Sequence, residues 1–111
     1  MLVAERKRLL NVVCNENGDP IAVSDADSGL DAETIFLGRN DQIEWQSLDD
    51  QDFTVEFKQG FGQPFADWDS TKMKGKSVLG KIKAGQKGKR FPYSILIEGK
   101  EPFDPAIIIE R

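Results

Sequence analysis

Basic side chains are concentrated in residues 72–90, the part of the sequence whose composition best suits binding. This stretch has eight Lys or Arg residues and no acid, whereas residues 15–70 have fourteen acids and two bases. Clustered lysines can neutralise phosphates and release their counterions, or they can contact an acidic protein surface. The bases predicted to bind are Lys81, Lys83, Lys87, Lys89 and Arg90. The same pattern is also typical of an edge strand whose lysines prevent aggregation.

The net charge favours one of these two classes of partner. It is −4 in spite of the basic stretch, whereas a dedicated nucleic-acid-binding protein usually carries a basic excess. We therefore expect a protein partner, and binding of an anion or nucleic acid through residues 72–90 is the alternative.

Carboxylates form two groups that could act as acid and base. They are Asp49, Asp50 and Asp52 in one loop, and Glu98, Glu101 and Asp104 in another. Two carboxylates that flank a glycosidic bond can catalyse its hydrolysis. Both groups lie in short loops, where carboxylates are usually solvated, so we predict that the chain is not an enzyme.

Three aromatic residues lie in the irregular stretch 60–69. Phe61, Phe65 and Trp68 could stack on sugar rings, or they could form a lid over one end of the core. We predict the lid, and a carbohydrate-binding module is a further alternative.

Residue types that bind transition metals are scarce. The sequence has no His and one Cys, Cys14, so a zinc, haem or mononuclear copper site has almost no ligands to draw on. We predict no metal and no other cofactor.

An acidic loop at residues 24–33 resembles a calcium loop only in part. Asp25, Asp27 and Asp31 supply carboxylates at alternate positions, but an EF-hand also needs Gly at position 6 and Glu at position 12. Counted from Asp25, these positions are Leu30 and Phe36, so we reject calcium binding.

The elements that must position these residues are strands. Apolar and other residues alternate in residues 53–58 and 91–97, which is the period of a strand with one buried face. Residues 9–14 and 106–109 are short apolar runs of the same kind. No segment has a sustained helical period, so we predict about seven strands in a sandwich or barrel of antiparallel sheets.

We expect residues 1–111 to form a single domain with one modest core. No run reaches the ~20 apolar residues of a membrane span. The first residues contain no apolar stretch with a small-residue cleavage site. These features predict a cytoplasmic protein, or a periplasmic one if a signal peptide has been removed.

The order of motifs resembles the cupredoxin family of plastocyanin-like proteins. A strand that ends in Trp45 is followed by the F-x-V-x-F strand at 53–57, Pro64-Phe65, Ala84-Gly85 and the F-x-Y-x-I-x-I strand at 91–97. The resemblance covers about Ile35 to Ile109. It implies an all-β, Greek-key antiparallel β-sandwich, and a fibronectin-like or immunoglobulin-like sandwich is the main alternative.

The same resemblance implies that copper cannot bind. Phe53 stands where the family has its first His, and Ile95 stands where it has its Cys. The loop that should carry the remaining ligands offers only Lys100, Glu101 and Asp104, and nothing in the sequence places Cys14 near it. Blue-copper chemistry needs thiolate and imidazole together.

We therefore predict a non-catalytic, copper-free, cupredoxin-like binding or accessory module that acts in protein–protein interaction. Trp45 should be buried against Phe57 or Tyr93. The basic residues should be exposed along one edge, with the acidic loops 24–33 and 47–52 elsewhere.

Overall fold

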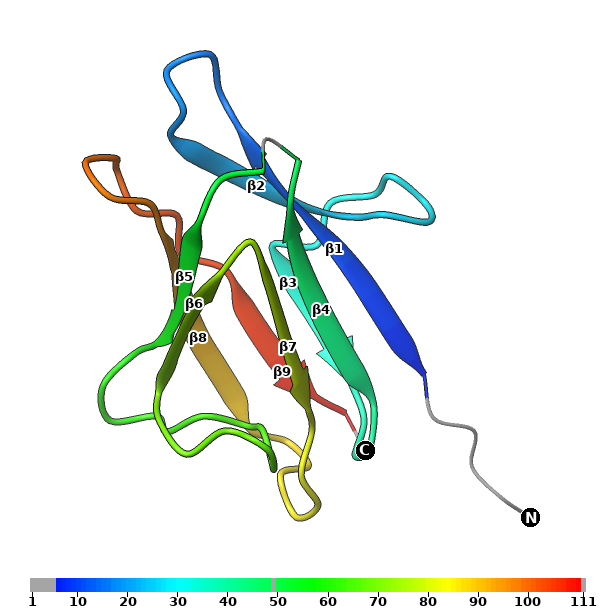
Figure 1. Cartoon of the computed structure of the whole chain (residues 1–111). Helices are drawn as coiled ribbons and strands as arrows, with labels where there is room; N and C mark the ends of the chain where they lie inside the picture. Colours follow the sequence, from blue (N-terminus) through cyan, green and yellow to red (C-terminus); the bar gives the residue numbers. More distant parts are fainter. Residues whose placement is uncertain (1–5, 49, 111) are drawn as a thin grey trace.

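The computed structural model describes residues 6–48 and 50–110, and these form two packed β-sheets (Figure 1). No helix occurs among these residues, so none of them forms a helix that could span a membrane. The strands are β1 (Lys7–Cys14), β2 (Pro20–Asp25), β3 (Thr34–Leu37), β4 (Gln42–Ser47), β5 (Phe53–Phe57), β6 (Lys72–Gly75), β7 (Ser77–Lys81), β8 (Arg90–Leu96) and β9 (Ala106–Ile109). The all-β prediction is confirmed.

The sheets are mixed, so the prediction of antiparallel sheets is wrong at two strand pairs. The four-stranded sheet has the order β2-β1-β4-β7, and the five-stranded sheet has the order β3-β9-β8-β5-β6. β1 pairs with β4 in parallel, as does β3 with β9. These partners are far apart in the sequence, and no hairpin turn dictates their relative direction.

The described residues also contain more strands than the seven or so expected. The strand that was not predicted is β6, whose four residues are exposed or half-buried. Three of its residues are exposed and Gly75 is half-buried, so β6 lacks the buried side chains from which the other strands were predicted.

The core lies between the sheets and centres on Trp45. Trp45 and Tyr93 are fully buried, and their ring centroids are 5.3 Å apart. Trp45 Nε1 donates a hydrogen bond to the Tyr93 hydroxyl at 3.1 Å. The predicted packing of Trp45 against Tyr93 is confirmed. Burial raises the pKa of Tyr93 far above its usual range, more than the hydrogen bond from Trp45 lowers it.

Two of the three loop aromatics form a lid over this core. Phe65 and Trp68 are buried, and their ring centroids lie 5.6 Å and 5.7 Å from that of Phe57. Trp68 Nε1 also donates to the Leu79 carbonyl at 2.9 Å. The lid is confirmed for Phe65 and Trp68 but not for Phe61, which is exposed, so the three side chains do not form one platform for sugar stacking.

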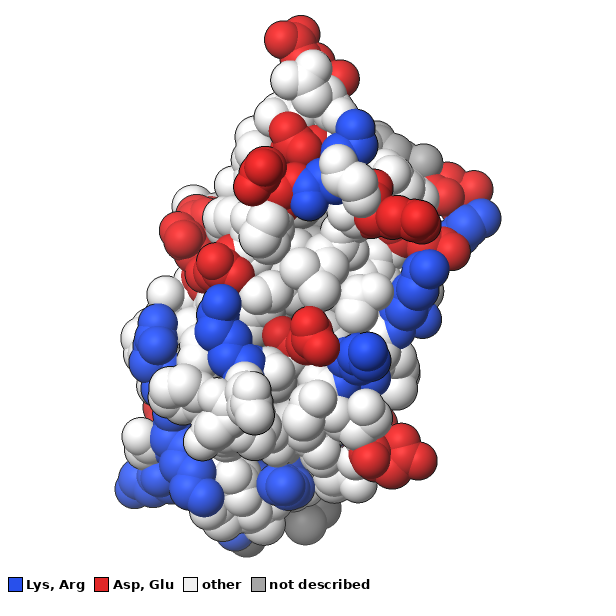
Figure 2. Space-filling model, turned by 90° about the vertical axis from the view of Figure 1, so that its left-hand side faces the viewer, with Lys and Arg blue, Asp and Glu red and all other residues white. Residues whose placement is uncertain are grey.

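The connecting loops lie at two ends of the sandwich (Figure 1). One end carries loops 15–19 and 97–105 with residues 48 and 50–52, and the other carries loops 38–41, 58–71 and 82–89. We call the first the acidic end, since its exposed acids include Glu16, Asp50, Asp52, Glu98 and Glu101. We call the second the basic end. Figure 2 views the side that carries β5, β6 and β8, where acids gather toward the top and bases are most frequent in the lower half.

Candidate functional site

The predicted binding residues lie together at the basic end. We call residues 81–90 the basic loop, because it begins with Lys81 at the end of β7 and finishes with Arg90 at the start of β8. β7 is the edge strand of one sheet, whereas β8 is an inner strand of the other. The five bases therefore lie around one end of the sandwich. They do not lie along a single edge, which was the predicted arrangement.

Backbone hydrogen bonds hold the basic loop at both of its ends. The Ile82 N–H donates to the Asp41 carbonyl at 2.9 Å, and the buried Ile82 side chain enters the core. The Gly88 N–H donates to the Ile109 carbonyl at 2.7 Å, and the Ile109 N–H donates to the Lys89 carbonyl at 3.0 Å. Loops fixed in this way lose less conformational entropy when they bind a partner.

Glycine at two positions lets the loop turn between these anchors. Gly85 and Gly88 have φ of 82° and 83°, in the left-handed region that other residues rarely adopt. The Lys89 N–H donates to the Gln86 carbonyl at 3.0 Å and closes the second turn. The exposed tip of the loop lies between these anchored segments.

The bases of the loop differ in exposure and in their contacts. Lys87, Lys89 and Arg90 are exposed, whereas Lys81 and Lys83 are half-buried. Lys81 lies beside an acid, because its N–H donates to the Asp67 carboxylate at 3.0 Å. Among the described residues, the other four bases form no ion pair. These four charges can therefore meet a partner without first breaking an internal contact within this part of the chain.

The acidic loops lie away from these bases, as predicted. Residues 48 and 50–52 are at the acidic end (Figure 1). Loop 24–33 lies against β2, where the Ala32 N–H donates to the Val23 carbonyl at 2.7 Å. β2 and β7 are opposite edges of the four-stranded sheet. These two acidic loops are therefore separated in space from the basic loop.

The candidate catalytic carboxylates are only partly brought together. Asp50, Asp52 and Glu98 line one groove of about 640 Å³ at the acidic end, together with the lysines at 74 and 76. Asp104 lies elsewhere, where the Ser94 hydroxyl and Lys58 bond its carboxylate at 2.7 and 3.1 Å. Asp49 lies outside the described residues.

The pKa of Asp104 does not suit a catalytic acid. The hydrogen bond from Ser94 lowers the pKa, burial raises it by less, and Lys58 lowers it further. A general acid at neutral pH needs a raised pKa.

The positions that the sequence resemblance matches to copper ligands carry hydrocarbon side chains. Phe53 and Ile95 are buried in the core, and half-buried Phe103 packs against it. Among the described residues, no cluster of three or more His, Cys, Asp or Glu could hold a metal ion.

The position of Cys14 was not foreseen. Cys14 is the last residue of β1. The parallel pairing of β1 with β4 brings this end of β1 to the acidic end, beside the loop that follows β4. Period and turn signals in the sequence do not reveal such a pairing.

Asp25 has a structural role in the loop that was considered for calcium. Its carboxylate accepts hydrogen bonds from Arg8 at 2.7 and 3.1 Å, and from the N–H groups of Asp27 and Ser28. The Arg8 hydrogen bond is the largest cause of its lowered pKa.

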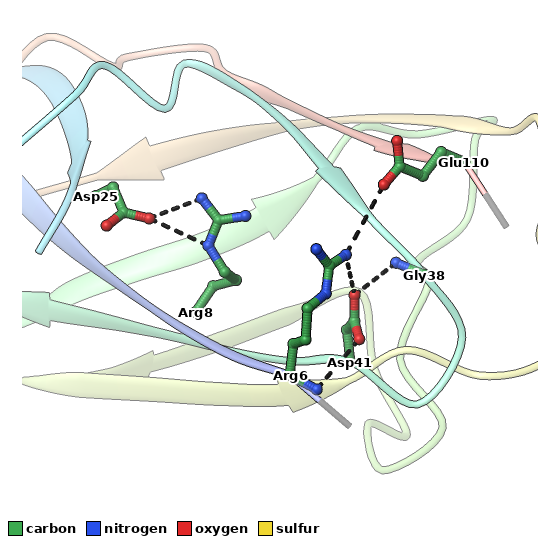
Figure 3. A network of polar contacts seen from close by, with 6 residues as sticks. All are labelled: Arg6, Arg8, Asp25, Gly38, Asp41 and Glu110. Carbon is green, nitrogen blue, oxygen red and sulfur yellow. Dashed lines mark hydrogen bonds and ion pairs between the residues drawn. The ribbon is translucent and has the colours of Figure 1, made fainter. Parts of the chain in front are cut away.

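A second ion pair supports the basic loop, and sequence reasoning missed it (Figure 3). Asp41 is 2% exposed, and its carboxylate accepts hydrogen bonds from Arg6 Nη2 at 2.9 Å and from the Gly38 N–H at 2.8 Å. Glu110 lies 3.8 Å from the same Arg6 nitrogen. The Asp41 carbonyl accepts the Ile82 N–H, so this ion pair holds one end of the basic loop in place.

The ionised form of Asp41 is stabilised by these contacts. Burial alone would raise the pKa of Asp41, but the hydrogen bonds from Arg6 and Gly38 outweigh it, and the pKa is lowered. A carboxylate of this kind contributes stability above its unfolded pKa, and the contribution is lost as the pH falls through its folded pKa.

We expect Asp41→Asn to lower the free energy of unfolding by about 1–3 kcal/mol at pH 7, because a charged acceptor is lost from a buried site. The difference from the wild type should begin to shrink as the pH falls below the unfolded value of about 3.9, because the unfolded wild-type chain then takes up a proton, and it should be lost as the pH falls through the lower pKa of folded Asp41. Urea denaturation at pH 7 and at about pH 2.5 measures both values.

Glu16→Gln is the matched control, because Glu16 is an exposed acid. It should change the free energy of unfolding by less than about 0.5 kcal/mol. An Asp41→Asn deficit of equal size at both pH values would show that the ionised carboxylate is not what stabilises the fold.

Comparison of this chain with models of known protein families, and with curated proteins, finds no match. The function is therefore inferred from the geometry and the charge of the two ends. Of the two, the basic loop combines a fixed backbone with exposed bases that form no ion pair among the described residues.

Proposed function

We propose that this chain is a copper-free, cupredoxin-like binding module that docks an acidic protein surface through the basic loop. The observation that carries the proposal is the set of bases at Lys83, Lys87, Lys89 and Arg90, which form no ion pair among the described residues. The module is non-catalytic and acts by positioning its partner.

The strand order supports the cupredoxin-like part of the proposal. The chain passes from β2 in one sheet to β3 in the other, returns with β4, and crosses again with β5 and β7. Repeated crossing between two packed sheets is typical of Greek-key sandwiches. The buried hydrocarbon of Phe53 and Ile95 supports the copper-free part, since neither side chain can bind a metal.

The distribution of charge supports a protein partner. Opposite charges on two surfaces steer their encounter and fix their orientation. The basic loop lies at one end of the sandwich, while the exposed acids at the other end would repel a long polyanion such as DNA. A compact acidic surface can contact the basic loop alone.

We expect the triple variant Lys83→Glu, Lys87→Glu, Lys89→Glu to lose partner binding and to keep its fold. Exposed charges such as Lys87 and Lys89 contribute only ~0–1 kcal/mol each to stability, and half-buried Lys83 forms no ion pair among the described residues, so the unfolding midpoint should change little. Immobilised wild type and variant are compared for capture of acidic lysate proteins, with heparin and duplex DNA as separate ligands. Wild-type capture should weaken steeply with salt, because screening acts over ~8–10 Å at moderate ionic strength.

The matched control is Lys72→Glu, Lys74→Glu, Lys76→Glu, which changes the net charge equally on and beside β6. It should capture the same proteins as the wild type. Equal capture by all three proteins would overturn the proposal. Tighter binding of wild type to DNA or heparin than to any protein would assign the loop to polyanions instead.

A further inference from the structure

Two exposed apolar residues lie at the charged ends of the sandwich and have complementary surroundings. Phe36 is 50% exposed on β3, next to the basic loop, and Leu48 is 60% exposed at the acidic end. Exposed apolar groups ringed by charge are typical of the centre of a docking surface.

Phe36 belongs to a cross-strand row that ends at a base. Phe36 is paired in register with Ile108, and Ile108 is paired with Arg90. Strands lie ~4.8 Å apart, so Arg90 is about 10 Å from Phe36 on the same face. Lys89 precedes Arg90 and is held to the end of β9, since its carbonyl accepts the Ile109 N–H at 3.0 Å. This row therefore joins an exposed apolar side chain, Phe36, to an exposed base, Arg90.

Leu48 lies in a loop whose charged residues have the opposite sign. It follows β4 directly, in the same loop as Asp50 and Asp52, which are exposed. The Asp50 side chain is 86% exposed, and its ion pair with Lys76 at 3.3 Å lies on the surface, where such pairs are weak. Glu98 lines the same groove as these two acids, together with the lysines at 74 and 76. The acidic end thus offers an exposed apolar side chain, Leu48, in the same loop as two exposed carboxylates.

We infer that the partner of the basic loop is the acidic end of a second copy of this chain. Leu48 of one copy contacts Phe36 and Ile108 of the next, and the neighbouring carboxylates face Arg90 and the lysines of the loop. This inference rests on the proposed function, since it uses the same basic surface.

The contact is head to tail, because its two surfaces differ. Contacts of this kind form open chains of molecules unless their rotation closes a ring. The net charge of −4 opposes the approach of two copies at long range. A surface with one aromatic and one leucine anchor is small, so the association should be weak, with a Kd on the order of 0.1 mM.

Sedimentation velocity of the whole chain tests the inference. The weight-average sedimentation coefficient should rise as the protein concentration increases from about 10 µM to about 1 mM at low salt. The rise should disappear in about 0.5 M NaCl, where the charges are screened within a few ångströms.

Phe36→Ser and Leu48→Ser should each abolish this rise, because each removes one half of the contact. Mixing the two variants should restore association, since one retains a working acidic end and the other a working basic end. The mixture should stop at dimers, because every other surface is blocked. Leu79→Ser is the control, because Leu79 is 43% exposed on β7 of the four-stranded sheet, away from Phe36 on the five-stranded sheet. Its sedimentation coefficient should rise with concentration as that of the wild type does.

The outcomes separate this inference from the proposed function. A wild type that stays monomeric at 1 mM overturns self-association. If that protein still captures acidic proteins through Lys83, Lys87 and Lys89, the proposed function stands. Association that survives both serine variants, or a mixture that stays monomeric when each variant is folded, also overturns the head-to-tail contact.

Discussion

Replacing Trp45 with alanine should lower the free energy of unfolding by about 3–5 kcal/mol, the usual cost of deleting a large buried aromatic side chain. Trp45 is fully buried, and its ring meets those of Phe65 and Tyr93 edge to face at centroid distances of 6.0 Å and 5.3 Å. Its removal leaves a cavity and takes away the hydrogen bond from Nε1 to the Tyr93 hydroxyl. Since a small domain has only ~5–15 kcal/mol in total, this loss is a large share.

Urea denaturation of Trp45→Ala and Trp45→Phe separates the two contributions. The phenylalanine variant keeps most of the apolar volume and loses the donor to Tyr93, so we expect it to be destabilised by about 1–3 kcal/mol. Leu79→Ala, at an exposed position on β7, should change little. A Trp45→Ala midpoint close to that of the wild type would mean that Trp45 is a surface residue.

The strand content and the core could be predicted because alternation reports burial directly. Trp45, Phe57 and Tyr93 stand at alternate positions of short strands, and each is buried. The parallel pairing of β1 with β4 could not be read in the same way. A strand's own sequence shows which face is buried and says nothing about which distant strand lies beside it.

The candidate site was predicted by charge and not by geometry. The bases of the loop stand out in the sequence because no acid occurs between Lys72 and Arg90. The pair of Arg6 with Asp41 has no such signal, because its members are 35 residues apart and each resembles an ordinary surface charge. One indication was available in the turn at Asn40-Asp41, where an Asp can bond to backbone N–H groups and fix the turn.

The ion pair and the basic loop are linked through the backbone. Asp41 holds the turn through the Gly38 N–H, and the turn holds Ile82 through two backbone hydrogen bonds, from the Ile82 N–H and the Asn40 N–H. A change at Asp41 should therefore loosen the loop as well as lower stability. In contrast, reversing Lys83, Lys87 and Lys89 should weaken binding without lowering stability. The two kinds of variant therefore distinguish residues that hold the loop in place from residues that contact the partner.

Gly80→Val should destabilise the fold by about 3 kcal/mol, at the upper end of the range for overpacked cores. A Cβ added at Gly80 would lie 2.6 Å from the Phe65 ring, closer than real contacts allow. That ring cannot easily move, because Phe65 also packs against Trp68 at a centroid distance of 4.8 Å and against Trp45 at 6.0 Å. A glycine in this strand thus makes room for the aromatic lid.

The backbone at Gly80 sets a limit on any gain from the substitution. Gly80 is not among the glycines with positive φ, so alanine or valine could adopt its conformation. Removing a glycine from the unfolded chain stabilises a protein by only ≈ 0.4–1 kcal/mol. The steric cost of ~1–3 kcal/mol exceeds this gain, so we expect Gly80→Ala to be destabilised by about 1–2 kcal/mol and Gly80→Val by more.

A double-mutant cycle assigns this loss to the Phe65 ring. Phe65→Leu should be destabilising alone, because it shrinks a buried side chain, but it should make room for the valine at position 80. We therefore expect the double variant to be more stable than the sum of the single changes predicts, by at least about 1 kcal/mol. Strict additivity would show that the ring does not cover Gly80, and the proposed packing of the lid against β7 would then be wrong.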